Sequence, residues 1–447
     1  MTALVLAPES TPAGQRARRV VALTQPGITE KAMVVLTAFV FVHEIPSSWL
    51  RNRGALESDY SNPLLVAVEL ALIAIAFARV AGSIDHLVTM VRTEPLVYGY
   101  ATLTFASTFW SADPSLTLRR ATIFVAVTLY GSYLVMRFSL DQILRLLAVM
   151  ALLSLVINLL FVFALPQYGV DAAGNWQGVF IQKNSLGYVA TLSIPTLLVS
   201  ARTYPVLRWV FYAGAAGHVA LLLGSQSKTM LMATLVTLAS MVVYKAFRGR
   251  KTLRGAVILS LVGSSTFAVA FATANIALLA RWLNKDITLT GRVPLWENLI
   301  PIALQKPFLG HGFGATFNGF FSPVHEVWIQ NRWNPSHAHN ALLQIWLEIG
   351  IFGVLLYLAV YLRSIRNATR IVAIVPGPVG LWPLTFFTTV LMMSITETGV
   401  GSEPLGWMMF MVAVLSTSLH LRHRSSLGLS NDIRAAVSGG SAGAVRP

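Results

Sequence analysis

The chain has 447 residues, of which 55% are hydrophobic and 11% are charged, and its net charge is +15. Soluble domains carry about 25% charged residues, so this composition excludes a soluble globular enzyme. It also has no cysteine, which excludes disulfides and thiolate chemistry. Positive charge on a soluble protein would suggest nucleic acid, but on a membrane protein it reflects topology, so no nucleic-acid partner is expected.

Twelve apolar segments follow one another along the chain. About 20 apolar residues cross a bilayer as a helix, because a helix satisfies its own backbone groups. The fold class is therefore predicted to be all-α: a polytopic integral membrane protein of about 12 transmembrane helices, surrounded by lipid bilayer. The segments are 32–48, 63–80, 95–110, 119–137, 142–165, 185–201, 206–224, 228–247, 255–280, 340–362, 371–394 and 404–421.

Basic residues orient this bundle. With the N-terminus inside, 22 of the 33 Lys and Arg residues fall in cytoplasmic segments, as the positive-inside rule requires. Residues 1–31 are then a cytoplasmic N-terminal segment, 32–421 the membrane domain and 422–447 a disordered cytoplasmic tail rich in Ser, Gly and Ala. Residues 281–339, between the ninth and tenth spans, form a long periplasmic loop, and loops of that length are uncommon without a function.

The densest chemical signal lies where this loop enters the tenth span. His337 and His339 stand there two residues apart, and histidine is the side chain best suited to proton transfer near neutral pH. A solvated histidine pair at a helix start is the plainer alternative. No third ligand has convincing spacing in the sequence, so neither a metal nor another cofactor is expected. Further candidates on the same stretch are Asn340, Glu348, Gly350 and Gly353.

Basic residues on the external side form a second signal, because positive-inside logic disfavours them there. Snorkelling to lipid headgroups explains any one of them. Several from distant segments instead suit an anionic lipid pyrophosphate. These residues are Arg120, Lys183, Lys228 and Arg292.

A third signal is the stretch F308-L-G-H-G-F-G314, with three glycines at alternate positions. It predicts a turn whose backbone approaches another group closely. Its spacing does not fit a dinucleotide-binding fingerprint.

Five motifs in order resemble those of the O-antigen ligase and polymerase superfamily, the WaaL, Wzy and ExoQ-type proteins. One is His339-Asn340, nine residues, Gly350, two residues and Gly353. The others are S107-T-F-W-S-A-D-P-S-L-T-L-R-R120, W176-Q-G-V-F-I-Q-K-N-S-L-G187, S225-Q-S-K-T229 and T290-G-R-V-P-L-W296. The resemblance covers roughly residues 95–420.

The resemblance implies a glycosyltransferase on the periplasmic face of the bacterial inner membrane. Its donor would be an undecaprenyl-pyrophosphate-linked oligosaccharide, and its acceptor a glycan. Carried over, His339 is the catalytic base with His337 in support, and Lys228 and Arg292 contact the pyrophosphate. Lys228 stands where ligases usually have Arg, which favours an ExoQ-type exopolysaccharide polymerase.

The chemistry of such a donor agrees with these residues. A sugar pyrophosphate already has a good leaving group, so the reaction needs a base and fixed cations, and a single displacement inverts the anomeric carbon. The alternatives are an O-antigen ligase that transfers the glycan to lipid A core or a protein, and a secondary transporter. A flippase and a chain-length regulator of the same pathway are the expected partners.

Overall fold

A computed structural model describes residues 26–43, 84–260, 292–318, 322–331, 335–398 and 404–440, with the single residues 71, 74, 78 and 401. Within these ranges the regular structure is helical, and a single isolated bridge joins Val170 and Trp176. The all-α prediction is confirmed. The predicted spans 63–80 and 255–280 lie largely outside the described residues.

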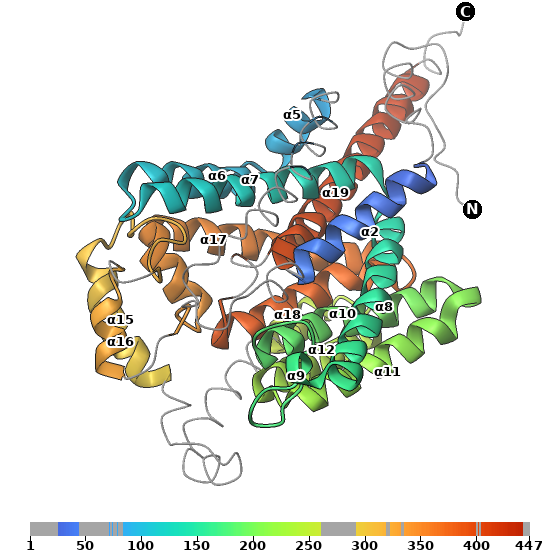
Figure 1. Ribbon diagram of the computed structural model, residues 1–447. Coiled ribbons are helices and arrows are strands. Elements are labelled where there is room, and N and C mark those ends of the chain that lie inside the picture. The colour runs from blue at the N-terminus through green and yellow to red at the C-terminus, as the bar shows by residue number, and fades with distance from the viewer. Residues whose placement is uncertain are drawn as a thin grey trace, which may run out of the picture.

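Helices from the first part of the chain form most of the bundle (Figure 1). They are α2 (Ile28–His43), α5 (Ile84–Thr93), α6 (Pro95–Ala106), α7 (Pro114–Arg137), α8 (Leu140–Ala164), α9 (Pro166–Gly169), α10 (Lys183–Thr203), α11 (Arg208–Ser225) and α12 (Lys228–Ala246). Short 3-10 turns cover Ser107–Trp110 and Pro205–Leu207.

The second part of the chain adds α17 (Ala341–Ile374), α18 (Trp382–Thr396) and α19 (Pro404–Gly440), with a 3-10 turn at Val379–Leu381. Two further helices lie inside the predicted loop, α15 (Arg292–Gln305) and α16 (His325–Asn331). Figure 1 shows these two side by side at one end of the bundle, next to the start of α17.

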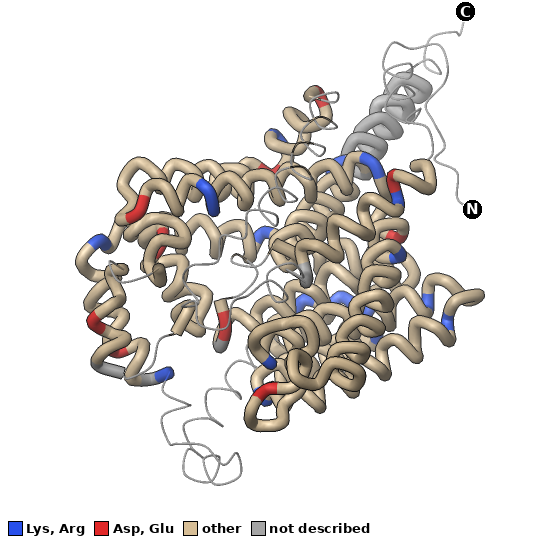
Figure 2. The backbone as a smooth tube through the Cα atoms, viewed as in Figure 1, with Lys and Arg blue, Asp and Glu red and all other residues tan. Residues whose placement is uncertain are grey.

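Five of the described helical segments are long and apolar enough to cross a membrane. They are Leu140–Ala164, Pro205–Ser225, Lys228–Ala246, Ala341–Ile374 and Pro404–His423. This confirms a polytopic helical membrane protein, whereas the count of twelve spans stays a prediction. Figure 2 shows few charged residues along the described helices, with long uncharged stretches between them, in keeping with the cost of a charge inside a bilayer.

Two predicted boundaries differ from the structure. The segment 371–394 was expected to be one span, but α17 continues to Ile374 and α18 starts only at Trp382. The sequence Pro376-Gly377-Pro378 interrupts the helix there, because proline cannot continue it and Gly377 has a φ of 82°. The tail was predicted to be disordered from residue 422, but the α19 backbone stays helical to Gly440.

Threonine and tyrosine hydroxyls join the helices inside the bundle. Thr237 of α12 bonds Thr389 of α18 at 3.0 Å, and Thr191 of α10 bonds Thr234 of α12 at 3.0 Å. Trp382 donates its indole N–H to Thr196 at 3.1 Å. Such bonds fix the relative height of neighbouring helices where apolar packing alone allows sliding.

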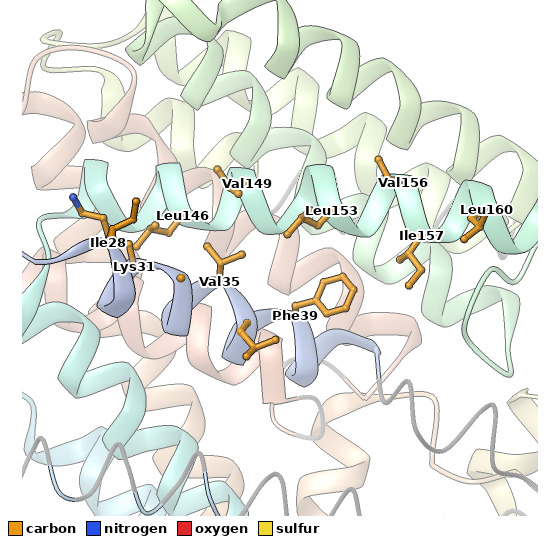
Figure 3. A pocket seen from close by; sticks show the side chains of 12 residues that line it. Ile28, Lys31, Val35, Phe39, Leu146, Val149, Leu153, Val156, Ile157 and Leu160 are labelled. Carbon is orange, nitrogen blue, oxygen red and sulfur yellow. The ribbon is translucent and has the colours of Figure 1, made fainter.

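An apolar groove of about 760 Å³ runs between α2 and α8 (Figure 3). Its walls include Val35, Phe39, Leu153 and Ile157, and Lys31 is the one charged residue among the described residues that line it. A groove with this lining suits contact with lipid chains.

Candidate active site

The start of α17 explains the His-Asn motif. Asn340 is the N-cap, and its side-chain oxygen accepts a hydrogen bond from the Leu343 N–H at 3.0 Å. Asparagine is among the best residues for this role, since it satisfies a backbone donor that the helix leaves open. His339 precedes the cap, is 8% exposed and has a φ of 50°. Asn340 therefore fixes where the helix begins, and so where His339 lies.

Both histidines meet a carboxylate that the sequence reasoning missed. Glu397 follows the last residue of α18, and its Oε2 lies 3.2 Å from His339 Nδ1 and 3.9 Å from His337 Nε2. The two imidazole ring centroids are 3.9 Å apart. The only sequence signal was an external acid directly after an apolar span, because 58 residues separate Glu397 from His339.

Arg292 completes the cluster from α15. Its Nη2 donates to Glu397 Oε1 at 3.0 Å. One carboxylate oxygen thus accepts from Arg292, and the other, Oε2, faces the histidines. Arg292 is 12% exposed and Glu397 8% exposed, so this ion pair is largely removed from water. A buried carboxylate held by a guanidinium has a fixed orientation.

Hydrogen bonds indicate the protonation states. The backbone N–H of His339 donates to the ring Nδ1 of His337 at 3.3 Å. Because Nδ1 accepts this bond, the neutral His337 ring carries its proton on Nε2. Burial, with help from the neighbouring His339 and Arg292 and against the attraction of Glu397, lowers the pKa of His337 to about 3. Burial alone would raise the pKa of Glu397, but the His339 hydrogen bond and the charges of His339, Arg292 and His337 lower it below its usual value. At pH 7 a neutral His337 thus faces an ionised Glu397.

The same cluster offers three metal-ligating atoms. Donor atoms of His337, His339 and Glu397 lie within 4.8 Å of one another, so the fold supplies the third ligand that was not apparent in the sequence. However, Arg292 already occupies one oxygen of Glu397, and a guanidinium beside the site opposes a second cation. The donor set therefore fits an acid–base pair better than a metal centre.

Backbone strain marks two places in the described chain. Among its non-glycine residues, positive φ occurs at Gln226 (49°) and His339 (50°). Such residues cost about 1–3 kcal/mol, persist where the surroundings impose them and cluster at functional sites. Gln226 immediately precedes Ser227 and Lys228, so both strained residues lie in motifs that the sequence singled out.

Two helices begin side by side at the second of these places. Lys183 is the first residue of α10 and Lys228 the first of α12, and Ser227 donates to Asn184 Oδ1 at 2.9 Å. At Gly187 a Cβ would lie 3.1 Å from Ser227 Cβ and Met230 Cβ, so only glycine allows this approach without displacement. Each helix start carries about half a positive charge, which adds to the two lysines.

The bonds between helices place these lysines at the height of Glu397. Thr237 is nine residues from Lys228, and its partner Thr389 is eight residues from Glu397. At about 1.5 Å per residue, the two charged groups lie roughly 14 and 12 Å from the same bond. Arg248, just after α12, donates to the carbonyl of Val372, ten residues before α18 begins, so α12 and α18 run antiparallel. The lysine end of α12 and the Glu397 end of α18 therefore lie at one face.

The bond between Thr196 and Trp382 gives the same result for α10. Thr196 is 13 residues from Lys183, and Trp382 is 15 residues from Glu397. Along the helix axes these separations are roughly 20 and 22 Å. Helix register thus gives the two lysines and Glu397 a similar height along the bundle.

Arg120 occupies a different place. Its guanidinium donates to the Gly314 carbonyl and interacts electrostatically with Glu348, so its described contacts hold the 308–314 turn. Glu348 is buried and accepts from Gln344 Nε2 at 2.8 Å. A role for Arg120 in binding pyrophosphate stays a prediction.

Gly350 breaks α17 with a φ of 72°, and the 308–314 turn fills the break. His311 and Gly312 donate their backbone N–H groups to the Leu347 and Glu348 carbonyls, both at 2.8 Å. A Cβ on Gly350 would lie 2.0 Å from the Phe308 carbonyl oxygen, which explains the glycine of the motif. Gly353 lies one turn further, where a Cβ would lie 2.3 Å from Ile349 Cγ1.

Comparison with known proteins agrees with this site. Residues 213–358, which include Lys228, Arg292 and His339, match the family model described as O-antigen ligase. The exopolysaccharide production protein ExoQ of Rhizobium meliloti is 26% identical over 275 residues, which cover 58% of this chain and 62% of that protein.

Shorter matches reach two proteins named as polysaccharide ligases. The Rickettsia felis protein is 31% identical over 96 residues, and the Rickettsia conorii protein is 32% identical over 94, each covering 20% of this chain and 23% of the relative. The chain therefore spans less than two thirds of the length of each of these relatives. By these comparisons, residues 213–358 resemble O-antigen ligases, and a larger part of the chain is similar to the exopolysaccharide production protein ExoQ.

Proposed function

We propose that the protein is an inverting, metal-independent glycosyltransferase that polymerises undecaprenyl-pyrophosphate-linked oligosaccharide repeat units into exopolysaccharide. The observation that carries this proposal is the His339–Glu397–Arg292 cluster, at the same height as Lys183 and Lys228. A base and fixed cations at one membrane face are what transfer from a lipid pyrophosphate requires.

In this mechanism His339 takes the proton of the acceptor hydroxyl. Its Nδ1–H donates to Glu397, so the lone pair is on Nε2, and Glu397 stabilises the imidazolium that forms. The acceptor oxygen bonds to the anomeric carbon while the bond from that carbon to the pyrophosphate oxygen breaks. The electron pair leaves with the pyrophosphate, whose charge Lys228 and Arg292 stabilise.

Topology gives the reaction its compartment. We place the active site at the periplasmic face of the inner membrane, with both termini in the cytoplasm, because of the distribution of basic residues. A flippase would deliver the donor to this face, and a chain-length regulator would act on the product. The ExoQ similarity covers 58% of the chain against 20% for each ligase-named relative, which favours polymerisation over ligation.

The test is polymerisation of purified lipid-linked repeat units by reconstituted protein. His339→Ala should lower the polymerisation rate by about 10²–10⁴-fold, which is the range that a positioned base contributes. His325→Ala, on α16, is the matched control and should keep wild-type activity. Equal rates for His339→Ala and wild type would refute the mechanism.

The same preparation separates the alternatives. Product on lipid A core but not on repeat units would favour the ligase, and solute uptake into proteoliposomes without glycan product would favour the transporter. Loss of activity with EDTA, restored by a divalent cation, would show that the histidine cluster holds a metal.

A further inference from the structure

The peptide between the two histidines is held from both sides by side chains. Ala338 is fully buried, and its N–H donates to Gln344 Oε1 at 2.8 Å. Its carbonyl accepts from the indole N–H of Trp296, also at 2.8 Å. Buried backbone groups must be paired, and no helix or strand does so here, so these two side chains take that role.

Each of the two side chains is itself fixed. Gln344 Nε2 donates to Glu348 Oε1 at 2.8 Å, one turn further along α17. Trp296 lies four residues after Arg292 on α15, and residues with this spacing share a helix face. One face of α15 therefore reaches both Glu397, through Arg292, and Ala338, through Trp296.

These contacts lie next to the strained residue. His339 has a φ of 50°, a conformation that persists only where neighbouring contacts impose it. The Ala338 peptide precedes this rotation, and the Asn340 cap follows it. Hydrogen bonds therefore hold the backbone on both sides of His339.

We propose that Trp296 and Gln344 are positioning residues, which clamp the Ala338 peptide so that His339 keeps the backbone conformation that directs its ring at Glu397. This inference rests on the proposed role of His339 as base. It gives Trp296, the tryptophan of the motif T290-G-R-V-P-L-W296, a function apart from packing. It also adds Gln344, which stands at an unspecified position of the His339-Asn340 motif.

The first experiment removes the acceptor and then restores it. Gln344→Met should lower kcat by about 10–100-fold with KM within about twofold, because the donor site is untouched while the base is misplaced. The double variant Gln344→Glu with Glu348→Gln should recover most of kcat. It keeps an acceptor for the Ala338 N–H and a donor between positions 344 and 348.

Matched controls lose the same kinds of bond elsewhere. Gln142 accepts from the Ser139 N–H at the start of α8, so Gln142→Met loses the same type of contact and should keep wild-type kcat. Trp296→Phe should lose kcat as Gln344→Met does, and Trp407→Phe, which loses the bond from its indole N–H to Thr128, should not.

NMR signals of the histidine rings test the position of His339 independently of activity. In protein labelled with 15N at its nine histidines, the ring signals of His339, assigned from His339→Gln, should shift in Gln344→Met and Trp296→Phe but not in Gln142→Met. Unchanged signals together with wild-type kcat would overturn the clamp. So would a swapped double variant as inactive as Gln344→Met. Full activity of His339→Ala would instead refute the proposed function, with the clamp still decided by the ring signals.

Discussion

Replacing Glu397 by glutamine should disable the proposed base while leaving the shape of the site unchanged. The carboxylate accepts from Arg292 at 3.0 Å through one oxygen and from His339 at 3.2 Å through the other. Glutamine has one carbonyl oxygen and one NH₂ group. Either Arg292 or the His339 Nδ1–H must therefore face the new NH₂ group, which is itself a donor. If Arg292 keeps the carbonyl oxygen, the His339 ring must turn or its proton must move from Nδ1 to Nε2.

The size of the effect follows from this loss of acceptor capacity. Hydrogen bonds to charged groups are worth about 1.5–3 kcal/mol each, and a base with its proton on the wrong nitrogen cannot react. In the serine-protease triad, aspartate to asparagine lowers kcat about 10⁴-fold for this reason. We expect Glu397→Gln to lower kcat by about 10²–10⁴-fold, which is roughly 3–5 kcal/mol in activation free energy.

The assay is single-turnover transfer from a purified lipid-linked repeat unit, with donor affinity measured separately by equilibrium binding. Glu297→Gln is the matched control, since Glu297 is exposed on α15, the helix that carries Arg292. Donor affinity should change far less than turnover. If Glu397→Gln turns over as fast as wild type, the carboxylate does not orient the base and the mechanism is wrong.

Three further predictions concern the donor, pH and topology. Lys228→Ala should raise the KM for donor strongly, and Lys228→Arg should be tolerated because it keeps the charge; wild-type polymer yield from Lys228→Ala would place the pyrophosphate elsewhere. Burial lowers the pKa of His337 to about 3, against an ordinary value near 6.5. Between pH 6.5 and pH 3 the unfolded chain therefore binds a proton at His337 that the folded chain does not. The free energy of unfolding consequently falls as the pH drops through this range. Between pH 7 and pH 5, the unfolding temperature of His337→Gln should therefore fall by less than that of wild type. A larger fall in the variant than in wild type would contradict a buried, neutral His337. A cysteine placed at Glu326 should react with an impermeant thiol reagent in intact spheroplasts, and labelling only after the membrane is opened would reverse the topology.

Local features of the sequence determined much of this protein. Hydropathy depends on composition over about 20 residues, so it predicted helices such as α8, α11 and α12 within a few residues of their bounds. The motif around His339 and Asn340 likewise located the start of α17, because capping is a contact over three residues.

Only the tertiary structure decided the chemistry around His339. Glu397 comes from 58 residues further along, and it meets His339 because α18 packs against α17, where Tyr361 donates to the Phe387 carbonyl and Asn340 to the Ile395 carbonyl. The Gly350 break is stable only because a turn some 40 residues earlier in the chain supplies donors to its carbonyls. A sequence shows which groups can bond, but which distant groups meet depends on how the helices pack, and that follows from the combined fit of side chains from segments far apart.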